Sequence, residues 1–181
     1  MRYLMKSPPA EEPISLEDAK LHLRVDTDDE DALIRELISA AREYCEDITS
    51  RALVTQTIIA YPKSFGEALP RPPLQSVAKV TYTDSTGAEH TMAPGVDYLV
   101  DTVNERLVLP AGKAWPTFAP NPVNPIIVEY TAGYDIPPRT VRQAMKLLIS
   151  YWYDNRQPGE LDERMQLAVG RILRSKRVRW F

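Results

Sequence analysis

The residue types that most often carry out chemistry are few in this chain, and they lie apart in the sequence. The 181 residues include two histidines, His22 and His90, and one cysteine, Cys45. Neither histidine has a second histidine or a cysteine at metal-ligand spacing, so we interpret both as solvated or capping residues. Cys45 has no partner for an internal disulfide, and we interpret it as a small buried apolar residue rather than a nucleophile.

Carboxylates are frequent, but their spacing favours helix capping over catalysis or metal binding. Asp26, Asp28 and Glu30 alternate in the way that opens a calcium-binding loop. Such a loop needs glycine at its sixth position and glutamate at its twelfth, where this chain has Asp31 and Leu37. The glycines form neither a phosphate-binding loop nor a nucleophile elbow. The sequence therefore predicts no catalytic, cofactor or metal site.

Composition indicates a globular protein with a sizeable core. The chain is 44% hydrophobic and 26% charged, which is typical of one domain, and we treat residues 1–181 as a single domain. The net charge of −3 does not mark the whole molecule as a polyanion binder. No apolar run approaches the roughly 18 residues of a membrane span. The first apolar segment is too short for a signal peptide, so we expect an intracellular protein.

Charge is distributed unevenly along the chain. Residues 11–47 contain 13 acidic and 4 basic residues, a net charge of −9, whereas residues 137–181 contain 4 acidic and 10 basic residues, a net charge of +6. Either the two ends lie against each other within one subunit, or the acidic face of one subunit meets the basic face of another. For the second alternative, the candidate interface residues are Asp28, Asp29, Glu30, Asp31, Arg139, Arg142 and Tyr151.

Apolar periodicity predicts helices at both ends of the chain. From Asp28 to Ser50, apolar residues recur at steps of one, three and four, which indicates an amphipathic helix. A capping box at residues 15–18 opens a shorter helix before it, and we expect residues 26–28 to supply the N-cap of the longer one. A third helix with a broad apolar face is predicted from Pro138 to about Asn155, and a last helix from Glu160.

The middle of the chain has a β composition. Residues 52–134 are rich in Val, Ile, Thr and Tyr and are divided by turn residues, which predicts five or six short antiparallel strands. The expected strands are Leu53–Tyr61, Leu74–Thr83, Asp97–Val100, Arg106–Leu109 and Ile126–Tyr134, with a weak strand around His90. A long loop over residues 112–125 carries Trp115 and Phe118, either as satellite core or as a contact surface.

The predicted fold class is therefore α+β. A helical bundle of residues 13–50 and 137–156, formed by N- and C-terminal helices, is interrupted by an antiparallel β insertion of residues 52–134. Residues 157–181 form a C-terminal helix and a basic tail.

Several segments of the chain carry a family resemblance by their order and spacing. They are PISLEDAKLHLRVDTDDEDALIRELISAAREYCEDITSRALVTQT from Pro13, LPRPPLQSVAKVTYTD from Leu69, AGKAWP from Ala111, VEYTAGYDIPP from Val128 and LLISYWYDNR from Leu147. Together they resemble the head-tail connector, or adaptor, family of tailed phages, whose members are often described as DNA-packaging or head-completion proteins. The resemblance runs from about Pro13 to Arg156, and residues 157–181 are less typical of the family.

The resemblance implies a structural protein of the virion rather than an enzyme. Copies of such adaptors assemble into a ring, commonly of about twelve subunits, that docks beneath the portal and prolongs the DNA channel. The implied partners are other copies of the chain, the portal protein, a tail-side stopper or tail completion protein, and the DNA passing through the channel. The resemblance implies no cofactor and no membrane. The implied location is the neck of the virion, and the host cytoplasm during assembly.

The chain ends in RILRSKRVRWF, which combines basic and aromatic residues. Arginine and aromatic side chains are enriched at interface hot spots, so we hypothesise that this segment docks on the portal or another partner. The residues concerned are Arg171, Arg174, Lys176, Arg177, Arg179, Trp180 and Phe181. The alternatives are a solvated end and a DNA-binding module that uses the basic C-terminus. A small enzyme with an unrecognised site is the third functional class that we consider.

Overall fold

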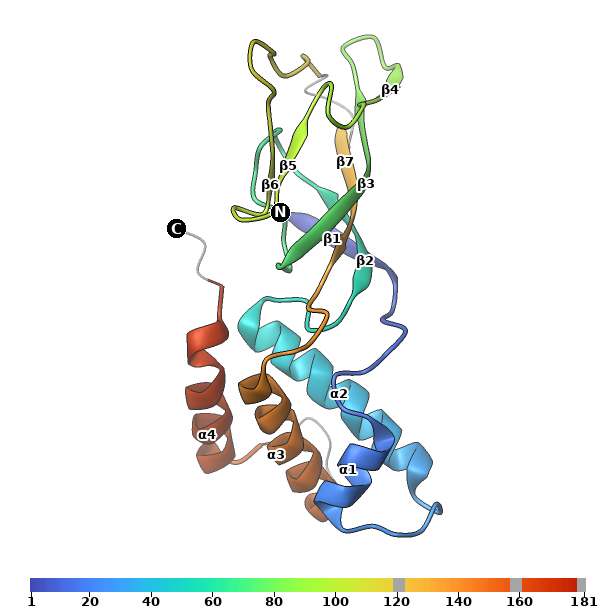
Figure 1. The fold of residues 1–181 in the computed structure, drawn as a ribbon, viewed down its shortest axis with the longest axis vertical. Helices are drawn as coiled ribbons and strands as arrows, with labels where there is room; N and C mark the ends of the chain where they lie inside the picture. The colour runs from blue at the N-terminus through green and yellow to red at the C-terminus, as the bar shows by residue number, and fades with distance from the viewer. Residues whose placement is uncertain (119–122, 157–160, 179–181) are drawn as a thin grey trace. The chain divides into compact units, whose positions relative to one another are not determined.

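The computed structural model of the protein describes residues 1–118, 123–156 and 161–178. The chain divides into two compact units (Figure 1). The β unit consists of Met1–Ala10 and Thr55–Gly133, and the helical unit consists of Glu11–Val54 and Tyr134–Phe181. Each unit is therefore assembled from two separate stretches of the sequence.

The helical unit is organised around its longest helix. Its elements are α1 (Leu16–Leu23), α2 (Asp31–Thr49), α3 (Arg139–Asn155), α4 (Glu163–Leu173) and the 3₁₀ turn η1 (Arg174–Lys176). Helix α2 packs against α1, α3 and α4, and α3 packs against α1 and α4. Buried residues of all four helices form one apolar core that includes Ala19, Leu37, Leu148 and Val169. Among the described residues, no helix has the length and apolar character needed to cross a membrane.

The start of α2 differs from the prediction. The helix begins at Asp31 rather than Asp28, and its N-cap residue, Glu30, forms no side-chain capping hydrogen bond. The predicted cap from residues 26–28 is wrong because the carboxylate of Asp28 binds the amine of Lys20, at 2.6 Å, instead of backbone N–H groups of α2. The predicted cap of α1 is confirmed, since Ser15 accepts a hydrogen bond from the backbone N–H of the third helical residue.

The β unit contains a five-stranded antiparallel sheet in the order β1-β2-β7-β3-β4, and a separate pair of strands, β5 and β6. The strands are β1 (Arg2–Ser7), β2 (Gln56–Tyr61), β3 (Leu74–Thr83), β4 (Glu89–Thr91), β5 (Leu99–Asp101), β6 (Arg106–Val108) and β7 (Ile126–Ala132). Strand β7 alternates buried and half-buried residues along its whole length, so one face of the sheet is core. The α+β fold class is thus confirmed.

Two features of the β unit go beyond or correct the sequence predictions. Strand β1 was not predicted, and it is held by antiparallel pairing with β2 while most of its side chains stay exposed. Strand β2 begins at Gln56 rather than Leu53, because Leu53 belongs to the core of the helical unit. In the long loop, Trp115 stacks on Phe65 with ring centroids 5.0 Å apart. The two alternatives for the aromatic residues of this loop were satellite core and a contact surface, and this stacking favours satellite core.

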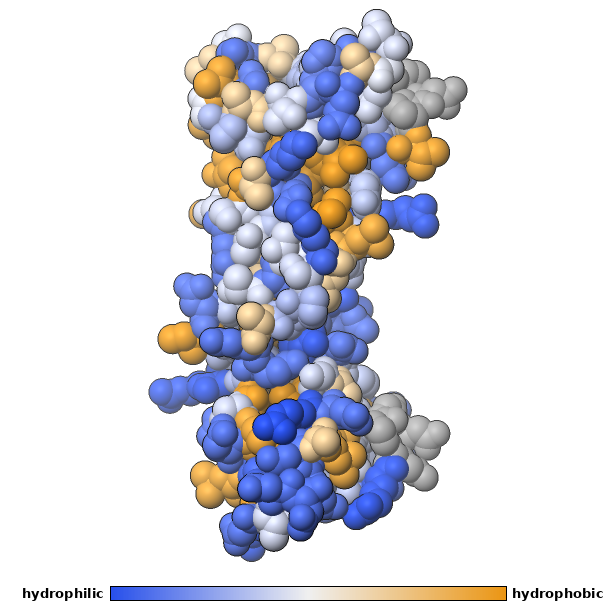
Figure 2. Space-filling view, turned by 90° about the vertical axis from the view of Figure 1, so that its right-hand side faces the viewer, coloured by the Kyte–Doolittle hydropathy of each residue, from blue (hydrophilic) through white to orange (hydrophobic). Residues whose placement is uncertain are grey.

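The surface carries no broad apolar face on the side drawn in Figure 2. Orange apolar side chains appear there in separate patches among blue hydrophilic ones, over both units. Exposed large apolar residues are scattered over several elements and include Leu21 on α1, Val103 after β5 and Leu167 on α4. Isolated apolar side chains of this kind are ordinary on protein surfaces. A recognition surface on this protein is therefore more readily formed by charged groups than by apolar ones.

Candidate functional site

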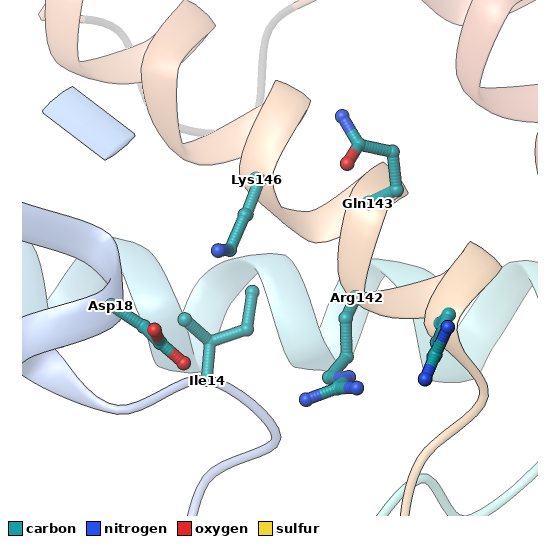
Figure 3. Close-up of a pocket in the computed structure, with 6 residues that line it drawn as sticks. Ile14, Asp18, Arg142, Gln143 and Lys146 are labelled. Carbon is teal, nitrogen blue, oxygen red and sulfur yellow. The ribbon is translucent and has the colours of Figure 1, made fainter. Parts of the chain in front are cut away.

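A basic pocket of about 270 Å³ lies in the helical unit, beside the first two turns of α3. Its lining residues are Ile14, Asp18, Arg139, Arg142, Gln143 and Lys146. Figure 3 shows Arg142 and Lys146 extending from α3 on the side that faces Ile14, in the segment before α1, and Asp18, in the first turn of α1. Three of the six lining residues are cations and one is an anion, so the pocket is positive.

The packing of α3 positions these cations. Arg139, Arg142 and Lys146 are three and four residues apart, which places them along one face of the helix. The opposite face is anchored in the core, where Met145 and Leu148 are fully buried. The burial of its apolar stripe therefore fixes the rotation of α3 about its axis, and this rotation determines where the three cations lie.

The cations of the basic pocket have no matching carboxylate in the described part of the chain. No ion pair within residues 1–118, 123–156 and 161–178 involves Arg139, Arg142 or Lys146. Like charges three or four residues apart on a helix repel each other by roughly 0.2–0.5 kcal/mol per pair. Asp18 lines the pocket but forms no ion pair with these three cations. Chemically, the pocket suits an anion with several oxygen acceptors, such as a carboxylate.

Most of the acidic residues proposed for an interface are already paired within the helical unit. The amine of Lys20 lies 2.6 Å from Asp28 Oδ1 and 2.8 Å from Asp31 Oδ1. The hydrogen bond from Lys20 lowers the pKa of Asp28, and the hydrogen bonds to the two carboxylates raise the pKa of Lys20. Asp31 also lies 3.9 Å from a guanidinium nitrogen of Arg35. Within the described residues, only Asp29 of the four proposed acidic residues is exposed and has no side-chain partner.

Two further residues proposed for an interface also make contacts within the helical unit. Glu30 accepts a hydrogen bond from the hydroxyl of Tyr153, which raises the pKa of Tyr153, and it pairs with Arg156 at 3.3 Å. The hydroxyl of Tyr151 accepts a hydrogen bond from the backbone N–H of Asp162, at 3.2 Å, next to the start of α4. The first alternative for the charge asymmetry, pairing within one subunit, therefore accounts for part of it.

The basic C-terminal segment is attached to the end of α2 over its described part. The backbone oxygen of Lys176 accepts a hydrogen bond from Arg51 Nε at 2.7 Å, and the N–H of Val178 donates to the Thr49 carbonyl at 2.9 Å. The exposed cations of the segment are Arg171, Arg174 and Arg177. Arg179, Trp180 and Phe181 lie outside the described residues.

Sequence reasoning missed part of the basic pocket. Arg139 and Arg142 were proposed, but Lys146 was not, although its spacing of four residues from Arg142 was a usable signal. Ile14 and Asp18 were missed because their approach to α3 depends on packing between segments more than 120 residues apart in the sequence. No group of three or more His, Cys, Asp or Glu residues able to hold a metal ion occurs in the part of the chain that the structure describes.

Comparison with known proteins gives a match to a family over part of the chain, and a fold over all of it. Residues 13–94 match the model of a family described as phage gp6-like head-tail connector protein. The resemblance to head-tail connectors that the sequence predicts is thereby confirmed. Because this family consists of structural connectors rather than enzymes, the prediction of a protein that is not an enzyme is confirmed as well. No curated protein matches the chain.

Three solved structures share the fold over the whole chain. The first is from the neck of an empty GTA particle computed with C6 symmetry, with 22% sequence identity and a TM-score of 0.77. The second is from the virion of a native gene transfer agent (GTA) particle, with 22% identity and a TM-score of 0.76. The third is from the neck of a native GTA particle computed with C12 symmetry, with 21% identity and a TM-score of 0.75. Each match covers 100% of this chain and 98% of the other.

Proposed function

We propose that this head-tail connector protein forms a ring of identical subunits in the neck of a phage-like particle, below the portal. There the ring prolongs the DNA channel and provides the attachment site for the tail, through a tail-side stopper or tail completion protein. The observation that carries the proposal is the family match over residues 13–94. The full-length likeness to chains from particle necks, described with sixfold and twelvefold symmetry, supports a ring of about twelve subunits.

The surface chemistry of the helical unit is suited to such a ring. A closed ring uses heterologous contacts, in which two different faces of each subunit are complementary. The basic pocket of α3 and the exposed acidic residues between α1 and α2 are two different surfaces of opposite charge. Electrostatic complementarity fixes register and partner choice, which a ring of many copies requires.

Electron microscopy of the purified protein, alone and mixed with the portal of the same particle, tests the proposal. We expect rings, either free or assembled on the portal, with the channel continuous through both. Particles made without the protein should contain packaged heads that lack tails, and the wild-type chain should restore the tails. A protein that neither forms rings nor binds the portal, and whose loss leaves tailed particles intact, would contradict the proposal.

The docking hypothesis for the basic C-terminal segment is best tested by substitution. Truncation after Gly170 would also remove Leu173, which is fully buried, so it would confuse docking with folding. Arg171, Arg174 and Arg177 are exposed, so we expect their replacement by glutamine to leave the fold intact and to weaken portal binding. The matched control replaces three exposed cations of the β unit, Arg2, Lys63 and Lys79, by glutamine. A loss confined to DNA affinity would instead support the alternative of a DNA-binding module.

A further inference from the structure

We infer that the basic pocket of α3 is a carboxylate-binding site, and that its occupant is the acidic loop of a second copy of this chain. The acidic loop is defined here as residues 26–29, which join α1 to α2. The inference rests on the ring proposed above and names the two surfaces that meet in it.

The pocket has the chemistry of a receptor for carboxylates. Arg142 and Lys146 are half-buried at its wall, and Ile14 beside them is only 2% exposed. An arginine can bind a carboxylate with two parallel hydrogen bonds, and partial burial makes such bonds stronger than they are in water. The volume of about 270 Å³ is about nine times the share of one water in the liquid, so it can admit more than one carboxylate side chain. A bound carboxylate would also relieve the repulsion among the three cations.

The acidic loop has the chemistry of a ligand. Asp26 and Asp29 are exposed and have no side-chain partner among the described residues. Asp28 is bonded to Lys20, yet 89% of its side chain remains accessible. The loop therefore offers carboxylates to an incoming surface without breaking the ion pairs that hold α1 to α2.

The geometry of α1 assigns the loop to another copy. The pocket is lined by Asp18 in the first turn of α1, whereas the acidic loop follows the end of this eight-residue helix. Eight helical residues span about 12 Å, so the loop cannot enter the pocket of its own chain unless α1 unwinds. Pocket and loop are thus two different surfaces of one subunit, as a head-to-tail contact in a ring requires.

A charge-exchange experiment tests this assignment. The pocket variant carries Arg142→Glu and Lys146→Glu, and the loop variant carries Asp26→Lys and Asp29→Lys. Each variant alone brings like charges together. We therefore expect its self-association in sedimentation velocity, or its ring assembly on the portal where the wild-type chain needs the portal, to weaken at least tenfold. An equimolar mixture pairs each altered pocket with an altered loop and each native pocket with a native loop. We therefore expect the mixture to recover assembly, in rings where the two variants alternate.

Two controls keep the result interpretable. Lys63→Glu with Lys79→Glu makes the same change of charge on the β unit and should leave assembly unchanged. Because the pocket variant also places glutamates near Asp18, a milder form with Arg142→Gln and Lys146→Gln is measured beside it, after circular dichroism has shown that both are folded. Wild-type association should weaken as salt rises, since exposed charges are screened over about 8 Å at physiological ionic strength.

The possible failures can be told apart. Rings that form equally well from the pocket variant, or a mixture that does not recover assembly, would overturn the inference and leave the connector function standing. A pocket variant that assembles normally but loses affinity for DNA would reassign the pocket to phosphate. A wild-type chain that stays monomeric both alone and on the portal would contradict the proposed ring, and it would overturn this inference as well.

Discussion

The buried arginine of α2 offers the sharpest test of how the helical unit is held together. Arg42 is 4% exposed, and its guanidinium lies 2.9 Å from Glu12 Oε2 and 3.1 Å from Glu46 Oε2. Glu46 is 3% exposed, and its other oxygen accepts a hydrogen bond from the backbone N–H of Leu53 at 2.8 Å. This cluster therefore ties the segment before α1 and the segment after α2 to the middle of α2.

We predict that replacing Arg42 lowers the free energy of unfolding more than replacing Glu46 does. Arg42→Met keeps most of the apolar stem but takes the positive charge away from a buried carboxylate, and removing one partner of a buried pair costs about 3–5 kcal/mol. Glu46→Gln keeps the volume and the acceptor for the Leu53 N–H, and Arg42 retains Glu12. The main loss is then one charged hydrogen bond, worth about 1.5–3 kcal/mol.

Urea unfolding followed by the helical circular dichroism signal measures these changes, because every described α-helix lies in the helical unit. The double variant Arg42→Met with Glu46→Gln should cost less than the sum of the single variants, since each change removes the same interaction. A loss below about 1 kcal/mol for Arg42→Met would refute the reasoning. So would additive single costs, because they would show that the two side chains are not energetically coupled.

Two further predictions address one residue of each unit. Leu37→Ala in the middle of the buried stripe of α2 should cost about 2–5 kcal/mol, whereas exposed Arg35→Ala should cost less than about 0.5 kcal/mol; similar melting temperatures would show that the buried face is misassigned. Hydrogen bonds from Thr86 and His90 lower the pKa of Asp84. The stability that they add to this turn is thus present above the unfolded pKa of about 3.9 and is lost as the pH falls through the lower folded pKa. The NMR signal of the Thr86 amide should therefore titrate below pH 3.9, and a midpoint near pH 4 would contradict this.

The parts of the fold that follow from burial were predictable from the sequence. The stripe of α2 was recognised because a helix that buries one face must repeat its apolar residues with the period of the helix. Strand β3 has the predicted bounds, Leu74–Thr83, because a segment containing Val, Thr and Tyr lies between Pro73 and the turn that begins at Asp84. Strand β1 could not be found in this way. It is stabilised by backbone hydrogen bonds to β2, and the exposed Leu4 and Met5 leave no alternation of apolar and polar residues to detect.

The site could be predicted only in part, because charge along a sequence does not show which charges are already matched. Residues 11–47 and 137–181 were recognised as electrostatic opposites, and two explanations remained open. Within the described residues, the structure pairs Asp31 with Lys20 and Glu30 with Arg156, so these carboxylates are matched within their own chain.

In the proposed ring, the charges that remain unmatched within one chain are the ones available to a neighbouring copy. An ion pair formed within one chain gains little from a second partner, because its charge is already compensated over the short range at which screened charges interact. The unmatched anions Asp26 and Asp29 follow the end of α1, and the unmatched cations Arg142 and Lys146 face its start. These anions and cations have no ion-pair partner among the described residues of their own chain. A contact between copies that joins the two sets would give each of them one. In the proposed ring, this separation along a single helix would give each copy two different faces, and therefore a direction in which the ring can grow and close.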